Sequence, residues 1–205
     1  MRLAVFASGN GSNFQALVEY FRERGLTDQF VWRFCDHPNA YVLARASKLD
    51  ISTSVFSPKE FQTKKAYEEK ILECLLDKEV DLIVLAGYMR IIGSTLLDQY
   101  ESRIINIHPS LIPSFCGTGF YGLKVHEAAL ARGVKVVGAT VHFVDEGTDT
   151  GPIILQKAVE VKEGDTPEIL QRRVMEEAEW VIMPKAIDLI ANDKIEVVDG
   201  LVRSR

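Results

Sequence analysis

The sequence lacks the features that mark membrane proteins, nucleic-acid-binding proteins and disulfide-stabilised secreted proteins. No apolar run approaches the roughly 20 residues that a membrane-spanning helix needs. No run of Lys and Arg suggests a nucleic-acid or membrane-surface patch, and the net charge is −5. The three cysteines, Cys35, Cys74 and Cys116, are odd in number and lack C-x-x-C spacing, which argues against a disulfide framework. These absences predict a cytoplasmic protein with no nucleic-acid or membrane partner.

Length and composition predict one folded domain. The chain has 205 residues, of which 47% are hydrophobic and 26% charged, so it can bury a substantial core. It shows no internal repeat, low-complexity tract or linker, and we therefore expect a single domain over residues 1–205. The segment Met1–Asn10 is short and breaks at glycine, which favours a first strand over a signal peptide.

Strands and helices alternate through the first half of the sequence. Compact apolar runs predict four strands, at Leu3–Ala7, Phe30–Cys35, Thr53–Phe56 and Asp81–Ala86. Helical patterns follow them: one from Phe14 to Gly25, one through Val42 and Ala46, a long one over Lys64–Lys78, and a short one from Ser94. This alternation predicts an α/β fold with a doubly wound, mostly parallel sheet.

The second half predicts an antiparallel addition to that sheet. Strands are expected at Val134–Phe143 and Ile153–Val161, and the turn Asp145–Pro152 between them is too short for a parallel crossover. Helical patterns cover Val125–Ala131 and Glu168–Ala191, and a terminal hairpin at Ile195–Val202 turns at Asp199-Gly200. We therefore expect an antiparallel strand near the C-terminal part of the sheet.

The segment Arg103–Gly117 carries the strongest candidate for chemistry. Ile104 and Ile105 end a buried strand, and Asn106 and His108 follow with one residue between them, so both point to one side. An amide and an imidazole together can polarise a carbonyl oxygen and handle a proton. The alternative is a polar strand end whose groups are satisfied by turn amides.

The segment S-G-N-G-S-N, Ser8–Asn13, links the first strand to the first helix. Its free backbone amides and the helix N-terminus can bind an anion. It is neither G-x-G-x-x-G nor a P-loop, so it suits a single phosphate better than a pyrophosphate. The alternative is an ordinary strand–helix turn that uses glycine for its backbone freedom.

Three candidate segments follow the carboxyl ends of predicted parallel strands: Gly9–Asn13, Gly87–Arg90 and Asn106–His108. Ligands of doubly wound sheets bind outside these strand ends. This shared position favours function over the structural alternatives.

Three motifs in this order, S-G-N-G-S-N, N-I-H-P-S-L-I-P and V-H-F-V-D-E-G-T-D-T-G-P, give the chain a family resemblance. It resembles the phosphoribosylglycinamide formyltransferases, folate-dependent enzymes of purine synthesis, from Arg2 to about Ile190. The resemblance implies a Rossmann-like formyltransferase domain. Within it, residues 1–100 would be the phosphate-binding half, 101–190 the catalytic and folate-binding half, and 191–205 a terminal tail or hairpin.

The resemblance implies transfer of a formyl group from 10-formyltetrahydrofolate, the co-substrate, to the amine of glycinamide ribonucleotide. Asn106 and His108 would bind the oxyanion of the tetrahedral intermediate, and Asp149 would lie beside His108. An ionised carboxylate there is expected to raise the pKa of the imidazole and fix its orientation. No metal is expected, since the four histidines show no zinc spacing.

The resemblance also implies binding residues. Gly11, Ser12 and Asn13 would take the substrate phosphate. Glu179 would bind the ribose, with Glu176 and Glu177 as competitors because V-M-E-E-A-E-W aligns only with a one-residue insertion before Glu179. The folate would contact seven residues: Lys64, Met89, Arg90, Ile91, Phe143, Val144 and Asp145. Without the resemblance, Met89 and Ile91 suit core packing, and Lys64 suits a solvated helix face.

Two other functions remain open at this point. A 10-formyltetrahydrofolate hydrolase shares the Asn, His and Asp but uses water as the acceptor, and it usually has an additional N-terminal domain. A non-catalytic nucleotide-binding module could use the same fold. The partners expected are the two small-molecule substrates, for a protein that is a monomer or a homodimer. The sequence departs from the family at Cys116-Gly117, where Pro-Gly is common, and in the loop after it.

Overall fold

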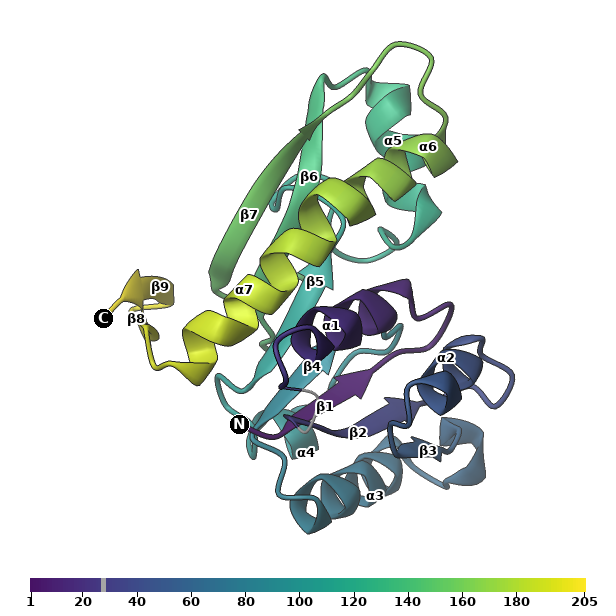
Figure 1. The fold of residues 1–205 in the computed structure, drawn as a ribbon, viewed down its shortest axis with the longest axis vertical. Coiled ribbons are helices and arrows are strands. Elements are labelled where there is room, and N and C mark those ends of the chain that lie inside the picture. Colours follow the sequence, from purple (N-terminus) through teal and green to yellow (C-terminus); the bar gives the residue numbers. More distant parts are fainter. Residues whose placement is uncertain (27–28) are drawn as a thin grey trace. The chain divides into compact units, whose positions relative to one another are not determined.

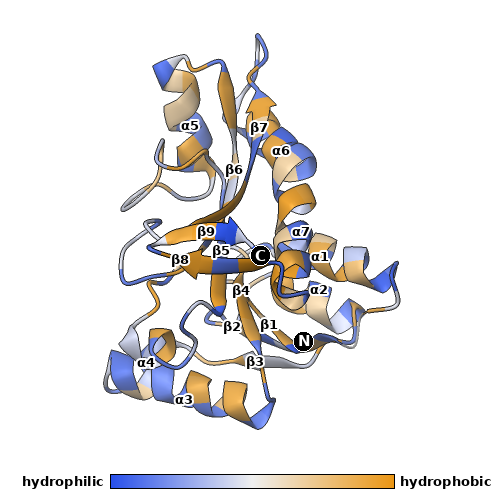
Figure 2. Ribbon diagram, turned by 90° about the vertical axis from the view of Figure 1, so that its left-hand side faces the viewer, coloured by the Kyte–Doolittle hydropathy of each residue, from blue (hydrophilic) through white to orange (hydrophobic). Residues whose placement is uncertain are grey.

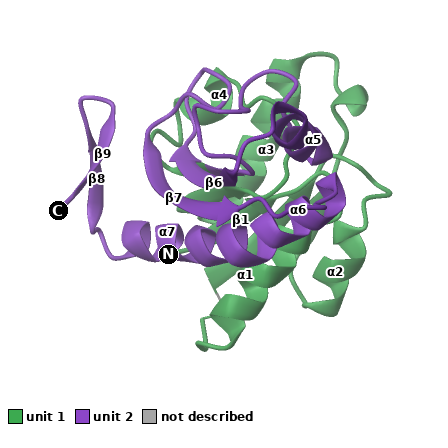
Figure 3. Cartoon of the chain, turned by 90° about the horizontal axis from the view of Figure 1, so that it is seen from above, with its two compact units in different colours: residues 1–105 green, residues 106–205 purple. Residues whose placement is uncertain are grey.

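The computed structural model describes residues 1–26 and 29–205, which divide into two compact units, 1–105 and 106–205 (Figure 3). The described strands β1 to β7 follow the order β3-β2-β1-β4-β5-β6-β7 in a mostly parallel sheet, and β8 and β9 form a separate pair. The α/β fold class is thereby confirmed, including the antiparallel strand in the C-terminal part. That the chain is a single domain stays a prediction.

Unit 1 is a parallel sheet between two groups of helices. Its strands are β1 (Leu3–Phe6), β2 (Phe30–Cys35), β3 (Thr53–Val55) and β4 (Leu82–Leu85), with β1 paired to β2 and β4, and β2 to β3, all parallel. Helices α1 and α2 lie on one face of the sheet, and α3 and α4 on the other (Figure 1). The four helices are α1 (Ser12–Arg22), α2 (Val42–Lys48), α3 (Lys64–Asp77) and α4 (Ser94–Leu97).

The core of unit 1 explains why these short strands form. Every residue of β1 is fully buried, and Leu82, Ile83 and Val84 of β4 are as well, which matches the hydrophobic centre of the sheet in Figure 2. Phe6 makes edge-on ring contacts with Trp32, Phe34 and Tyr88. A continuous apolar strand flanked by aromatic rings buries large apolar areas, so β1 and β4 form the core of unit 1.

Unit 2 is built on a long antiparallel pair of strands. Strand β5 (Ile104–His108) enters this unit at Asn106, and β6 (Val136–Phe143) pairs antiparallel with β7 (Ile153–Glu160). Helix α5 (Leu123–Arg132) precedes β6 and ends at Gly133, whose φ of 74° suits glycine. The helical stretch α6–η3–α7 packs along β6 and β7 (Figure 1).

The long helix expected over Glu168–Ala191 is helical throughout, but it contains a π-helical turn in its middle. The structure has α6 (Pro167–Val174), a π-helical turn η3 (Met175–Glu179) and α7 (Trp180–Ala191). A π-turn accommodates one extra residue without shifting the helix faces on either side. The turn coincides with the V-M-E-E-A-E-W segment, so it gives a physical reason for the one-residue insertion there.

The chain ends in the predicted hairpin. β8 (Ile195–Val198) and β9 (Leu201–Ser204) pair antiparallel around Asp199 and Gly200, both of which have positive φ. Among the described residues, the longest apolar helices fall short of what a bilayer crossing requires.

Candidate active site

Two side chains of β5 lie at the centre of a polar cluster in unit 2. His108 is buried, with 4% of its surface exposed, and its Nδ1 lies 3.5 Å from Oδ2 of Asp149. Asn106 contacts a different residue, His142, with 3.2 Å between Asn106 Nδ2 and His142 Nε2. His142 Nε2 is 3.6 Å from Asp149 Oδ1, so His142 connects Asn106 to Asp149. The structure therefore brings the three predicted catalytic residues into one cluster.

The backbone carbonyls around the two imidazoles fix where their protons lie. His108 Nε2 is 2.9 Å from the carbonyl oxygen of Phe115, which can only accept, so Nε2 carries the proton. In the neutral ring, Nδ1 is then the basic nitrogen, and it faces Asp149. His142 has the opposite tautomer, because its Nδ1 lies 2.7 Å from the carbonyl of Phe143. In the neutral ring its Nε2 then accepts from the Asn106 amide, whereas in the protonated ring Nε2 can donate towards Asp149.

His142 is a member of this cluster whose role the sequence left open. It is 2% exposed and lies on β6, at the end of the V-H-F-V pattern. Strand alternation predicts which face of the sheet His142 takes. It does not predict that the nine residues between β6 and β7 bring a carboxylate back to the imidazole ring. The only signal in the sequence was its position next to the proposed folate-binding turn.

Asp149 is held in place by the turn between β6 and β7. Its φ is 60°, a left-handed conformation that Asp tolerates better than most residues, and its Oδ2 accepts from the Gly117 amide at 2.9 Å. The backbone of Gly151 packs against the Phe143 carbonyl, so that a Cβ at position 151 would lie 1.9 Å from the carbonyl oxygen. The D-T-G-P sequence thus makes a turn that only glycine permits, and the turn aims the carboxylate at both imidazoles.

The pKa values of the pair differ from the expectation for His108. Burial lowers the pKa of His108, and this outweighs the Phe115 hydrogen bond and the Asp149 charge, which both raise it. The expectation of a raised pKa was right about the effect of the carboxylate but wrong about the net direction. Burial also acts to raise the pKa of Asp149, but its contacts with His142, His108 and Gly117 together lower it. The cluster thus combines an ionised carboxylate with a neutral imidazole.

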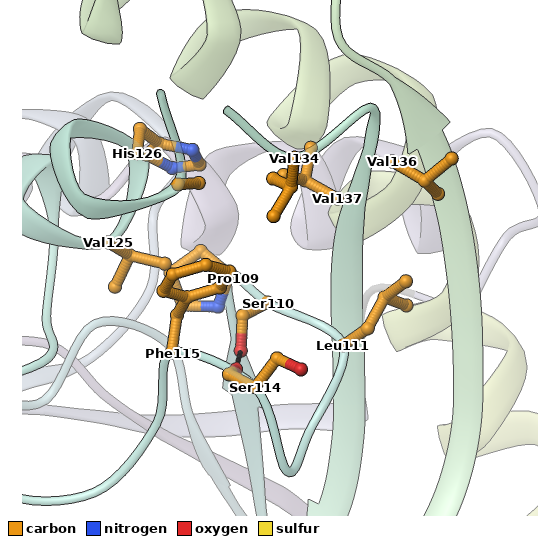
Figure 4. Close-up of a pocket in the computed structure, with 11 residues that line it drawn as sticks. Pro109, Ser110, Leu111, Ser114, Phe115, Val125, His126, Val134, Val136 and Val137 are labelled. Carbon is orange, nitrogen blue, oxygen red and sulfur yellow. Dashed lines mark hydrogen bonds between the residues drawn. The ribbon is translucent and has the colours of Figure 1, made fainter. Parts of the chain in front are cut away.

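An apolar pocket of about 90 Å³ lies behind Phe115, in the same unit (Figure 4). Its wall includes Ser110, which donates to the Ser114 carbonyl at 2.6 Å, and the buried ring of His126. His126 Nε2 has no hydrogen-bond partner among the described residues. Burial, together with the nearby His108, lowers the pKa of His126 to about 4, so this ring is neutral at pH 7.

The predicted phosphate loop lies in unit 1, where it leads from β1 into α1. Gly11 is in the left-handed region with φ 76°, and a Cβ there would lie 2.2 Å from Cγ2 of Val42. No side chain of the described residues caps this end of α1, and its first turn holds no acidic residue. The first amides of the helix at Ser12 and Asn13 are therefore suited to an anion.

The predicted folate residues of unit 1 lie at the surface. Met89 is 56% exposed and Ile91 62%, so the core-packing alternative is wrong for both. Between them, Arg90 Nε lies 2.5 Å from Oδ2 of Asp36, a fully buried carboxylate. Lys64 begins α3, and its Nζ is 3.6 Å from Glu68. Exposed apolar side chains beside a fixed ion pair suit a ligand surface.

The remaining predicted residues lie in unit 2. Phe143 ends β6 and is buried, and Asp145 is exposed with its Oδ1 accepting from Gly147 and Thr150. Glu179 ends the π-turn and is 4% exposed, whereas its two competitors are exposed. Burial distinguishes Glu179 from Glu176 and Glu177, because a solvated helix face would not bury a carboxylate. Val144 is half-buried.

Within residues 1–26 and 29–205, no three His, Cys, Asp or Glu side chains come close enough together to hold a metal ion.

The α/β fold and this cluster are suited to an enzyme that activates a carbonyl group by acid–base chemistry. A family model described as "Formyl transferase" matches residues 1–187. The chain is 50% identical over 173 residues to phosphoribosylglycinamide formyltransferase of Bacillus subtilis (strain 168), covering 84% of this chain and 86% of that protein. A structure of glycinamide ribonucleotide transformylase 1 from Symbiobacterium toebii matches with a TM-score of 0.92 and 41% identity, over 100% of this chain and 93% of that one.

This chain belongs to the formyl transferase family. The resemblance read from its motifs is confirmed, and the named relatives support neither the hydrolase nor the non-catalytic module. The trifunctional purine biosynthetic protein adenosine-3 of Bos taurus is 40% identical over 96% of this chain. The chain spans 19% of the length of that relative.

Proposed function

We propose that this chain transfers the formyl group of 10-formyltetrahydrofolate to the amine of glycinamide ribonucleotide. The products are N-formylglycinamide ribonucleotide and tetrahydrofolate, and the step belongs to purine biosynthesis. The observation that carries the proposal is the cluster of Asn106, His108, His142 and Asp149 in unit 2, with its two defined tautomers. Family membership and the names of the relatives support the same reaction.

Asn106 and His108 would stabilise the tetrahedral intermediate. The substrate amine attacks the formyl carbon, and the formyl oxygen becomes an oxyanion. His108 Nε2–H donates to the Phe115 carbonyl, and Phe115 has a left-handed φ of 49°, a strained conformation for an aromatic residue. We infer that the oxyanion replaces this carbonyl as the acceptor. Fixed donors aimed at a developing oxyanion contribute about 10²- to 10³-fold in rate.

The proton balance follows from the same tautomers. The amine forms a bond to the formyl carbon and loses a proton, and the bond from that carbon to folate N10 breaks as N10 gains one. His108 Nδ1 is the basic nitrogen of a neutral ring and faces the ionised Asp149. Asp149 stabilises the imidazolium as it forms, so His108 can hold a proton between the two steps.

Substrate-binding roles are assigned from each residue's surroundings. We assign the phosphate to Gly11, Ser12 and Asn13, and the ribose hydroxyls to Glu179, whose carboxylate is buried. The folate is assigned to the exposed surface and the turn described above, which comprise Lys64, Met89, Arg90, Ile91, Phe143, Val144 and Asp145. Both substrates are small molecules, and the protein would act as a monomer or homodimer in the cytoplasm.

The test is formyl transfer from 10-formyltetrahydrofolate, with and without glycinamide ribonucleotide, for wild type, His108→Ala and His108→Gln. We expect turnover that requires the ribonucleotide and a fall in kcat of about 10²- to 10⁴-fold in both variants. Urea unfolding of each variant separates a loss of chemistry from a loss of fold.

Two results would contradict the proposal. Deformylation of the folate at the same rate without the ribonucleotide would indicate the hydrolase. Wild-type protein that binds the ribonucleotide yet shows no turnover with the formyl donor would indicate a binding module.

A further inference from the structure

The phosphate loop of unit 1 is held by a side chain that comes from another element. Arg45 lies on α2, more than thirty residues along the chain from the loop Ser8–Asn13. Its Nε donates to the carbonyl oxygen of Asn10 at 2.9 Å, and its Nη2 donates to Asn10 Oδ1 at 2.7 Å. The same guanidinium thus binds both the backbone and the side chain of the residue at the tip of the loop.

A third contact ties the guanidinium to the helix that the loop precedes. Arg45 Nη1 donates to Oε1 of Gln15 on α1, and Gln15 Nε2 donates to Glu19 Oε1 at 2.7 Å. The cation lies 5.0 Å from the ring centroid of Tyr41, which supports it from the side. Arg45 therefore joins the loop, the first turns of α1 and the start of α2 with one rigid fork.

The backbone of α2 also fixes the loop. The Val42 amide donates to the Gly9 carbonyl at 3.1 Å, and Val42 fills the space that a Cβ on Gly11 would need. On its other side, the Ser8 amide donates to the Gly87 carbonyl at 3.0 Å, and Ser8 Oγ accepts from the Met89 amide at 3.0 Å. The loop has fixed points at both ends, and Arg45 provides the fixed point at its tip.

We propose that Arg45 is a positioning residue for phosphate recognition, because its fork on Asn10 and Gln15 holds the Ser8–Asn13 loop in the shape that binds the acceptor's phosphate. The phosphate-binding loop is therefore completed by α2. This inference rests on the assignment of the loop to the substrate phosphate. Preorganisation of the backbone amides matters here, because ordering a flexible loop on binding would cost part of the binding free energy of the phosphate.

The chemistry of the three acceptors explains why arginine is needed. The two oxygens of Asn10 and the one of Gln15 require donors in a planar fork. A lysine at this position keeps the charge but can satisfy only part of the set with a single nitrogen. Arg45→Lys therefore separates the effect of charge from the effect of loop geometry, and Arg45→Met removes both.

The first experiment measures inorganic phosphate binding by the full chain, from amide chemical shifts of the loop. We expect Arg45→Met to weaken phosphate binding about tenfold, the size expected from losing one hydrogen bond to a charged group, with Arg45→Lys between Met and wild type. The matched control is Arg22→Met, an arginine of the same unit whose Nη2 donates to the Leu49 carbonyl away from the loop. It should bind phosphate as the wild type does.

The second experiment measures formyl-transfer kinetics for two proteins with two acceptors. The proteins are wild type and Arg45→Met, and the acceptors are glycinamide ribonucleotide and the glycinamide riboside that lacks the phosphate. We expect Arg45→Met to raise the KM for the ribonucleotide about tenfold, to leave the KM for the formyl donor unchanged, and to cost nothing further with the riboside. A general loss of structure would affect both acceptors and the donor alike.

The outcomes separate the positioning role from the proposed function. Equal phosphate binding in Arg45→Met and wild type, no phosphate binding by wild type, or an equal penalty with both acceptors would overturn the role of Arg45. Phosphate binding that depends on Arg45, in a protein that shows no formyl transfer, would support this role while the proposed reaction failed.

Discussion

The buried polar residues of the two units differ in kind. Among the described residues of unit 1 the buried charged side chains are Arg33, Asp36 and Glu68, residue types whose unperturbed pKa values lie far from neutrality. In unit 2 they are mainly the imidazoles of His108, His126 and His142, whose unperturbed pKa lies near neutrality. The buried charges of unit 1 therefore suit a structural role in the framework of that unit. The buried imidazoles of unit 2 suit the transfer of a proton.

The partners of these groups support that division. In unit 1, Asp36 binds Arg90, and Glu68 accepts from the Gly93 amide at 2.8 Å, where a Cβ on Gly93 would lie 2.5 Å from the carboxylate. Both contacts hold the segment after β4, one through the Arg90 side chain and one through the Gly93 backbone. In unit 2 the ring nitrogens of His108 instead face one fixed acceptor and one carboxylate, so a proton can move there without breaking the framework.

The largest effect of a change outside β5 is expected for Asp149→Asn, which breaks the cluster of unit 2. It removes a charge that raises the pKa of His108 and that would stabilise the imidazolium, so we expect kcat/KM to fall about 10²- to 10³-fold. The acidic limb of the pH–rate profile should also move to lower pH, because the pKa of His108 falls further. The measurement is kcat/KM against pH.

Glu146→Gln is the matched control, since Glu146 is an exposed acid of the same turn. It should change neither the rate nor the position of the acidic limb. An acidic limb that stays in place in Asp149→Asn would show that His108 is not the group that titrates in the rate.

The pH dependence of stability should come mainly from the buried His126. Its pKa is about 4 in the folded state against 6.5 for the free side chain, so the unfolded chain binds the proton more readily. Stability is therefore unaffected above about pH 6.5 and falls as the pH drops from 6.5 towards 4, by about 3 kcal/mol in all. His126→Leu should remove most of this loss, as measured by urea unfolding at pH 7.5 and pH 4.5.

His37→Gln provides the comparison, since His37 is an exposed histidine of unit 1 with 56% of its side chain accessible. It should retain the full loss of stability at low pH. If His126→Leu lost as much stability between the two pH values as wild type, the buried imidazole would not be the source.

Some features of the fold and of the site could be predicted from the sequence, and others could not. The apolar runs at Leu3–Ala7 and Asp81–Ala86 predicted buried strands correctly, because continuous burial leaves a direct record in residue type. The π-turn at Met175–Glu179 was missed, because one extra residue barely alters helical periodicity over a single turn. The placement of Asn106 and His108 on one strand could be predicted, because they are two residues apart at the end of an apolar run.

The parts of the site that the sequence could not supply depend on how the chain returns to itself. His142 contacts both Asn106 and Asp149 only because the turn after β6 folds back. The number of residues between them in the sequence does not predict how close they lie in space. The lowered pKa of His108 depends on burial by neighbouring segments, whereas the sequence showed only the carboxylate that raises it. The burial of Arg33 is equally hidden, since arginine is usually exposed.

Arg33 offers a test of whether the buried charges of unit 1 are purely structural, because its replacement by an apolar residue should raise the free energy of unfolding. It is fully buried, its Nε contacts Thr53 Oγ1 at 3.3 Å, and its Nη1 and Nη2 have no hydrogen-bond partner among the described residues. Burial lowers its pKa, which is a sign that the folded state disfavours the charge. Arg33→Met should therefore stabilise the protein by about 2 kcal/mol in urea unfolding.

Arg22→Met is a suitable control for that gain, because Arg22 lies at the surface of the same unit and its removal should leave stability nearly unchanged. A loss of stability in Arg33→Met would mean that the buried guanidinium binds a partner in solution. The role of Arg33 would then not be purely structural.

The smallest expected effect concerns Lys64, whose folate role can be separated from its structural one by a neighbouring lysine. Lys64 Nζ lies 3.6 Å from Glu68 and Lys65 Nζ lies 3.8 Å from Glu69, with 59% and 78% of the two lysine side chains exposed. Because both lysines are exposed, each pair contributes at most about 0.5 kcal/mol, so Lys64→Ala and Lys65→Ala should unfold almost as wild type does. If Lys64 binds the glutamate tail of the folate, only Lys64→Ala should raise the KM for the formyl donor, by about threefold. Equal KM values in the two variants would remove Lys64 from the folate site and leave it as a solvated residue of the framework unit.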